Sequence, residues 1–148
     1  MPVITTDVLI EGVKRDEVFQ WLSDPENHDR FLAGTFDEVS RDGDRSWSLT
    51  LKMPPRSRVI GYEFLEPDDS HGGRRVLCRT TGKRTAGKLN YSLRTMKPSS
   101  NTLVTLHADY SPGGFLGAAL DVAVLRKTLE DRYQGVLDNM ARVIAAGE

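Results

Sequence analysis

The chain has almost no cysteine, no long hydrophobic run and no excess of charge of one sign. Its one cysteine, Cys78, cannot form a disulfide within the chain, which favours a reducing compartment, and we expect a cytoplasmic protein. Because no stretch of about 18 apolar residues occurs, we expect no integral membrane segment. The net charge is −1, from 20 basic and 21 acidic residues. Nucleic-acid-binding domains are usually strongly basic, so nucleic acid is not an expected partner.

The composition is that of an ordinary globular protein. Hydrophobic residues make up 39% and charged residues 28% of the 148 positions. A chain of this length is expected to form one domain, here residues 1–148, and to bury roughly 68–70% of its unfolded surface. That is enough for a hydrophobic core without disulfides.

Most of the chain alternates between apolar and polar residues, as antiparallel strands with one buried face do. The first strand is expected over 3–11, followed by RSWSLTLKM, VIGYEFLE, RRVLCRTT, KLNYSLRT and TLVTLHADY. Residues 35–42 are a weaker strand candidate because they lack clean alternation. The side chains expected to face inward are Ile4, Thr6, Val8, Ile10, Trp47, Leu49, Leu51, Met53, Ile60, Tyr62, Phe64, Val76, Cys78, Thr80, Leu89, Tyr91, Leu93, Val104, Leu106, Ala108 and Tyr110.

Two short helices are expected after the first strand. One runs from Lys14 to Leu22, where apolar residues recur at helical spacing. In the next segment, SDPENHDRFL, Ser23 followed three residues later by Glu26 predicts a capping box. The second helix should then extend to about Leu32.

A long helix, expected over 115–146, ends the chain and would be about 45 Å long at 1.5 Å per residue. Its apolar residues fall on one stripe: Val122, Leu125, Leu129, Tyr133, Val136, Leu137, Met140 and Ile144. Such a stripe needs a large apolar partner, and the inner face of the sheet is the candidate. Gly135 costs this helix about 1 kcal/mol relative to alanine. Close approach to a strand, or room for a ligand, would each explain it.

Two segments carry a resemblance to a known family. VLIEGVKRDEVFQWLSDPENHDRF and YSPGGFLGAALDVAVLRKTLEDRYQGVLDNMARVI resemble the opening and closing segments of the polyketide cyclase/dehydrase group of the START-like superfamily, also called SRPBCC. The resemblance implies an α+β helix-grip fold. In that fold a curved antiparallel sheet of about six or seven strands wraps around a long C-terminal helix, with two short helices after the first strand. It also implies an apolar cavity between sheet and helix.

A cavity of this kind would be lined by large apolar side chains, with tyrosine hydroxyls as its orienting polar groups. The residues expected to line it are Trp47, Leu49, Leu51, Tyr62, Phe64, Cys78, Tyr91, Leu93, Leu106, Tyr110, Leu125, Arg126, Leu129 and Tyr133. Arg126 falls near the apolar stripe and would reach the cavity mouth, to pair with a ligand carboxylate or an inner acidic group. The same residues also suit a filled core in which each hydroxyl bonds a backbone partner. Both interpretations stay open.

The start of the last helix, FLGAALDVAVL, has Asp121 as its only charged residue. An exposed helix should have a polar face, and this segment has almost none. It is therefore a lid over the cavity mouth, the contact of a homodimer or of a membrane surface, or a segment buried under neighbouring turns.

Metal and acid–base chemistry have little support. His28, His71 and His107 are expected in a helix, a turn and a strand, so they form no local pair, and we expect neither a metal site nor a cofactor. His107 and Asp109 should face solvent. Cys78 is interpreted as a small buried hydrophobe. The inward-facing set contains no carboxylate or histidine, which argues against catalysis.

Three functions follow from these observations. The first is binding or transport of a hydrophobic small molecule, lipid or polyketide-like, in the internal cavity. The second is an enzyme of the cyclase or dehydratase type, which needs an acid–base pair inside that cavity. The third is a protein-interaction module with a filled core. A bound molecule would support the first two functions, and a concentration-dependent dimer would support the third.

Overall fold

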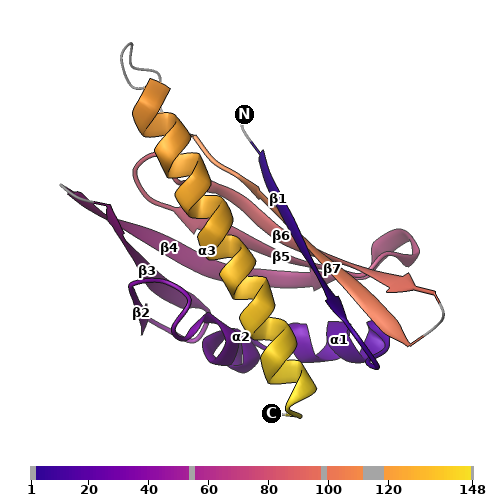
Figure 1. The fold of residues 1–148 in the computed structure, drawn as a ribbon. Helices are drawn as coiled ribbons and strands as arrows, with labels where there is room; N and C mark the ends of the chain where they lie inside the picture. Colours follow the sequence, from indigo (N-terminus) through magenta and orange to yellow (C-terminus); the bar gives the residue numbers. More distant parts are fainter. Residues whose placement is uncertain (1–2, 54–55, 98–99, 112–118, 148) are drawn as a thin grey trace.

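The computed structural model describes residues 3–53, 56–97, 100–111 and 119–147, with residues 56 and 119–122 described by their backbone alone. Figure 1 shows a curved sheet, a long helix lying across it, and two short helices at one end. In chain order the elements are β1 (Val3–Ile10), α1 (Arg15–Leu22), α2 (Pro25–Leu32), β2 (Glu38–Arg41), β3 (Ser46–Met53), β4 (Arg56–Asp68), the short 3-10 helix η1 (Ser70–Gly72), β5 (Arg75–Thr81), β6 (Gly87–Met96), β7 (Asn101–Asp109) and α3 (Ala119–Ala145).

The strands form one seven-stranded sheet in the order β1-β7-β6-β5-β4-β3-β2, and every neighbouring pair is antiparallel. Only the β1–β7 pairing joins distant parts of the chain; the others are between successive strands. The α+β helix-grip prediction is therefore confirmed. The weak strand candidate at 35–42 contributes the short edge strand β2.

The inner face of the sheet is built by the predicted alternation. From Trp47 to Tyr110, each residue expected to face inward is buried, except Met53, which is partly exposed. On β1, Ile4 and Ile10 are buried while the two inward residues between them are partly exposed. Because strand side chains alternate between the two faces, these residues converge on the concave side, against α3.

The long helix α3 is seated by an apolar stripe and by two hydrogen bonds to β1. Of the predicted stripe, the buried residues are Leu125, Leu129, Tyr133, Val136, Leu137 and Met140. Ile144 is only partly buried and its neighbour Val143 is buried instead, while the side chain of Val122 lies outside the described residues. Arg126 Nη2 donates to the carbonyl of Val3, and Gln134 Nε2 donates to that of Asp7, each at 3.0 Å. The helix therefore runs along β1. The start predicted at residue 115 lies outside the described residues.

The beginning of α2 differs from the prediction. Asp24, not Ser23, is the N-cap residue: its carboxylate accepts a hydrogen bond from the backbone N–H of Glu26, and Pro25 occupies the first turn. Ser23 instead donates its hydroxyl to the carbonyl of Phe19 in the preceding helix. Both serine and aspartate cap helices well, and the proline after Asp24 presets the helical φ of the first residue, which fixes the start one residue later.

Candidate ligand-binding interior

The predicted lining residues lie together between the sheet and α3, with one exception. None of them other than Arg126 is more than 6% exposed. They come from four strands, β3, β4, β5 and β6, from β7 with Tyr110 just after it, and from α3. Their side chains thus form one continuous apolar interior.

Arg126 lies outside this interior. Its side chain is 44% exposed, and its Nε donates to a carboxylate oxygen of Glu130, 3.0 Å away. The same guanidinium bonds the carbonyl of Val3 at the edge of the sheet. Arg126 was expected at the cavity mouth because its position in the helix is close to the apolar stripe. Its long side chain instead points to the β1 edge of the sheet.

His28 is the interior residue that the sequence analysis missed. It is fully buried on α2, where His28, Phe31 and Leu32 share one helical face at positions i, i+3 and i+4. Its ring is 4.8 Å from that of Phe31 and 4.9 Å from that of Phe64. The signal was therefore present in the sequence, as a histidine in register with the apolar face of a short helix.

The buried histidine is part of a chain of hydrogen bonds. His28 Nε2 is 2.7 Å from the carbonyl of Leu22, which can only accept, so this nitrogen carries the proton. His28 Nδ1 then accepts from the hydroxyl of Tyr62, at 2.7 Å. The Tyr62 oxygen in turn accepts from Tyr91, 2.9 Å away, and from the thiol of Cys78 at 3.6 Å. Four side chains from four elements therefore form one ordered network.

Burial keeps this network uncharged. It lowers the pKa of His28 to about 4, with the bond to the Leu22 carbonyl opposing the shift. It raises the pKa of the Tyr62 and Tyr91 hydroxyls well above their ordinary value, and that of the Cys78 thiol to about 12. At neutral pH the imidazole is a hydrogen-bond acceptor for Tyr62, and the thiol is a small, unreactive hydrophobe.

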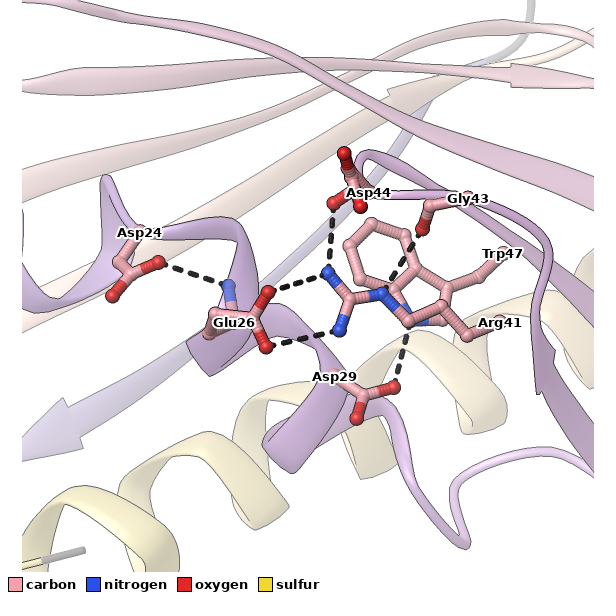
Figure 2. Close-up of polar contacts among 7 residues, drawn as sticks. All are labelled: Asp24, Glu26, Asp29, Arg41, Gly43, Asp44 and Trp47. Atoms are coloured by element: carbon pink, nitrogen blue, oxygen red, sulfur yellow. Dashed lines mark hydrogen bonds and ion pairs between the residues drawn. The ribbon is translucent and has the colours of Figure 1, made fainter.

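An arginine clamp holds α2 against the edge of the sheet. Arg41 of β2 makes a two-pronged bond to the carboxylate of Glu26 on α2, at 2.7 and 2.9 Å (Figure 2). Two further donors of its guanidinium bond the carbonyls of Gly43 and Asp44 in the turn before β3. This planar fork suits arginine and not lysine.

The clamp continues into the core through a tryptophan. The Arg41 guanidinium lies 5.3 Å from the ring centre of Trp47, and Trp47 Nε1 donates to Asp29 on α2, at 2.9 Å (Figure 2). Glu26 and Asp29 thus tie one side of α2 to β2 and β3. The other face of α2, with His28, is held toward the interior.

A surface depression of about 550 Å³ lies between the end of α2 and α3. It is lined by Ala33, Gly34, Thr35, Asp131, Arg132, Gly135, Asp138, Asn139 and Arg142, none of which belongs to the predicted lining set. A Cβ atom built on Gly135 would meet nothing within 4 Å. Close approach to a strand therefore does not explain this glycine; the other explanation, room for a ligand, stays a prediction.

The other candidate residues from the sequence lie in separate parts of the fold. His71 lies in η1 and His107 is exposed on β7, and the described residues contain no group of three potential metal ligands. Asp109 is partly exposed and bonds the backbone of Lys88. No helix in the described part of the chain could span a membrane. Of the apolar segment 115–125, residues 115–118 lie outside the described residues and residues 119–122 are described by their backbone alone. In the rest of the segment, Leu125 is buried and Val124 is 48% exposed.

Comparison with known proteins points to one family. A family model described as polyketide cyclase/dehydrase and lipid transport matches residues 1–145. No curated protein matches the chain.

Similar solved structures share the fold at low sequence identity. The Zhui aromatase/cyclase from a Streptomyces species is 12% identical, with 95% of this chain and 91% of that one aligned at a TM-score of 0.63. Norcoclaurine synthase from Thalictrum flavum, in complex with dopamine and hydroxybenzaldehyde, is 13% identical over 99% of this chain and 88% of its own, with a TM-score of 0.64. A protein from Thermus thermophilus is 16% identical over 99% of this chain and its own full length, with a TM-score of 0.66. At these identities the similarity shows the fold alone.

Proposed function

We propose, from the premise that this chain belongs to the polyketide cyclase/dehydrase and lipid transport family, that it binds a hydrophobic small molecule between the inner face of its sheet and α3. Family membership supports a ligand-binding or cyclase role. The apolar surface for a ligand would come from rings and aliphatic side chains on β3 to β7 and α3. The buried, single Cys78 is consistent with the reducing cytoplasm that we propose as its location.

The observation that carries this proposal is the polar network at the centre of an apolar interior. Replacing a buried polar network with well-packed apolar side chains is often neutral or stabilising, so the stability of the fold does not by itself require this network. Small-molecule sites, in contrast, combine apolar walls with a few converging polar groups. Tyr91 ends the chain that begins at His28, and its oxygen still has acceptor capacity for a ligand donor.

A second function, catalysis by a cyclase or dehydratase, is favoured by the same network. The directions of the hydrogen bonds allow a proton relay from a ligand to His28. Tyr91 accepts a proton from the ligand and donates its hydroxyl proton to Tyr62, and Tyr62 donates its hydroxyl proton to His28 Nδ1. The imidazole becomes imidazolium, and both tyrosines end as neutral hydroxyls. However, a base with a pKa of about 4 is weak at neutral pH. We therefore rank binding first.

Mass spectrometry of the gently purified protein under native conditions tests the proposal. We expect a bound mass that is lost on unfolding, and organic extraction should identify it. A Trp21→Phe variant leaves Trp47 as the only tryptophan, and Trp47 lies in the proposed lining. Returning the extract to the emptied protein should then change Trp47 fluorescence.

Tyr91→Phe is the matched site variant, because it removes one hydroxyl and keeps the ring. It should weaken binding of the extracted molecule. Thr102→Val serves as the control, because it removes a buried hydroxyl that bonds the carbonyl of Val13 and does not belong to the proposed lining. An empty protein that takes up nothing from a mixed lipid and polyketide extract would contradict the proposal. The third function, an interaction module that dimerises through the start of α3, would then be tested by sedimentation.

A further inference from the structure

The described interior of this protein offers neutral hydrogen-bonding groups and no charge. Among the described residues, the buried polar side chains are Asn27, His28, Thr80, Thr85 and Thr102; no aspartate, glutamate, lysine or arginine is among them. The one titratable group in this set, His28, is neutral at physiological pH because burial lowers its pKa to about 4. A charged ligand in this interior would lose its hydration without gaining an opposite charge.

The cation that the sequence suggested for a ligand carboxylate is engaged elsewhere. Arg126 bonds Glu130 and the carbonyl of Val3 on the exposed side of α3. Turning it inward would break both bonds and bury a guanidinium among apolar side chains. Nothing in the described interior therefore compensates an anion.

One hydroxyl on the inner face of the sheet has no hydrogen-bond partner in the described part of the chain. The oxygen of Thr6 is buried, and the structure gives it no hydrogen bond within the described residues. Thr6 is on the inner face of β1, in line with Ile4 and Ile10, and α3 is fixed over this part of the strand by its bonds to Val3 and Asp7. The other such oxygen, that of Thr85, lies in the turn between β5 and β6.

The unpartnered hydroxyl is level with the polar network. Thr6 is opposite Leu106 on β7, which is opposite Tyr91 on β6. With strands about 4.8 Å apart, the backbones at Thr6 and Tyr91 are about 10 Å apart across the sheet. A ligand lying over Leu106 would therefore have hydrogen-bonding groups on both sides.

We infer that the interior site takes an uncharged hydrophobic molecule bearing a hydroxyl or carbonyl oxygen, which hydrogen-bonds to Thr6, and that it rejects carboxylates. This inference rests on the proposed binding function and specifies its ligand class. A ligand oxygen at Thr6 would satisfy a group that is otherwise left without a partner. A carboxylate in the same place would have no cation to pair with among the described interior residues.

Three probes of matched shape test the inference: naphthalene, naphthol and naphthoate, measured by equilibrium dialysis at neutral pH. A hydrogen bond to a buried neutral group contributes a factor of about three to ten, so naphthol should bind that much more tightly than naphthalene. Naphthoate should bind on the order of a hundredfold more weakly than naphthol, because its charge is desolvated without compensation.

A pair of threonine variants locates the effect. Thr6→Val keeps the side-chain shape and removes the hydroxyl, so naphthol should lose its advantage over naphthalene while naphthalene binds as before. Thr5→Val changes the exposed neighbour on the outer face of β1 and should leave all three affinities unchanged. Urea denaturation of both variants checks that each is folded.

The outcomes separate this inference from the function on which it rests. If naphthoate binds as tightly as naphthol, the uncharged ligand class is wrong and the binding function stands. If Thr6→Val preserves the preference for naphthol, the role of Thr6 is wrong. If no probe binds and extraction returns nothing, both the inference and the binding function are overturned.

Discussion

The two helices that bear on the interior, α2 and α3, are attached to the same sheet in opposite ways. The short helix α2 has eight residues and is tied down by directional polar bonds: the Arg41–Glu26 fork, the Trp47–Asp29 bond and the His28–Tyr62 bond. The long helix α3 has 27 residues and relies mainly on an apolar stripe, to which two hydrogen bonds to β1 are added. Isolated short helices are unstable in water, so α2 depends on its tertiary bonds.

The two kinds of attachment suit two different roles, orienting a side chain for α2 and covering the sheet for α3. Hydrogen bonds fix an orientation, whereas apolar burial fixes mainly a contact area. α2 presents one histidine at a defined angle to Tyr62, and its bonds set that angle. α3 covers the inner face, and burial supplies most of its stability.

The largest effect should come from removing part of the α3 stripe. Leu137 is fully buried on this helix. Leu137→Ala should lower the free energy of unfolding by about 2–5 kcal/mol, because it loses transfer free energy and leaves a cavity. Urea denaturation measures the change. A loss well under about 1 kcal/mol would mean that α3 is not held by apolar burial.

The next effect should appear on α2 as a pH dependence. The folded-state pKa of His28 is about 4, below its ordinary value of 6.5. Between these values the unfolded chain binds the proton and the folded protein does not. The stabilising contribution of the neutral His28 should therefore be complete above pH 6.5. The free energy of unfolding should fall by roughly 3 kcal/mol as the pH falls from 6.5 to about 4.

The matched control for this pH dependence is His28→Gln, which cannot titrate in that range. Carboxylates also lose stabilising interactions in acid, so the histidine term is the difference between wild type and variant. Chemical denaturation at several pH values gives both curves. Parallel curves between pH 4 and pH 6.5 would show that His28 is not buried as a neutral imidazole.

A smaller effect is expected at the cap of α2. Asp24→Ala removes the side chain that accepts from the N–H of Glu26 and should lower the free energy of unfolding by about 1 kcal/mol. Ser23→Ala should cost less at this helix end, because Ser23 bonds the carbonyl of Phe19 and not the start of α2. A larger loss of unfolding free energy for Ser23→Ala than for Asp24→Ala, measured in the same denaturation series, would support the predicted capping box of Ser23 and Glu26 instead.

The smallest effect has the opposite sign and falls on α3. Gly135→Ala should raise the free energy of unfolding by up to about 1 kcal/mol, because alanine favours the helix and its Cβ would meet no atom within 4 Å. Thermal unfolding followed by circular dichroism measures it. Destabilisation instead would mean that something packs against this position.

The strands show how far alternation alone can be used. Apart from the partly exposed Met53, the inward sets from Trp47 to Tyr110 were correct, because antiparallel strands with one buried face place every second residue inside, whatever their partners are. The stripe of α3 was predictable for the same reason, with a period of 3.6. The proposed cavity lining, as an open site, stays a prediction.

Long and polar side chains were harder to place. Arg126 has a backbone near the stripe, but its guanidinium reaches the edge of β1, and four rotatable bonds lie between the two. His28 was treated as a lone histidine because its partners, Tyr62 and Tyr91, are 34 and 63 positions further along the chain. No local pattern connects residues that meet only when strands β4 and β6 are already paired.

The sequence by itself determined the α+β class, the order of the elements and which face of each strand and of α3 is apolar, because these depend on local periodicity and on the turn residues between the periodic segments. The tertiary structure decided which polar groups meet inside. Non-local strand pairing and the clamp on α2 bring His28 to Tyr62, and the hydroxyl of Thr6 is left without a partner among the residues that the structure describes. Hydrogen bonds require distances and angles that only the assembled sheet and helices define.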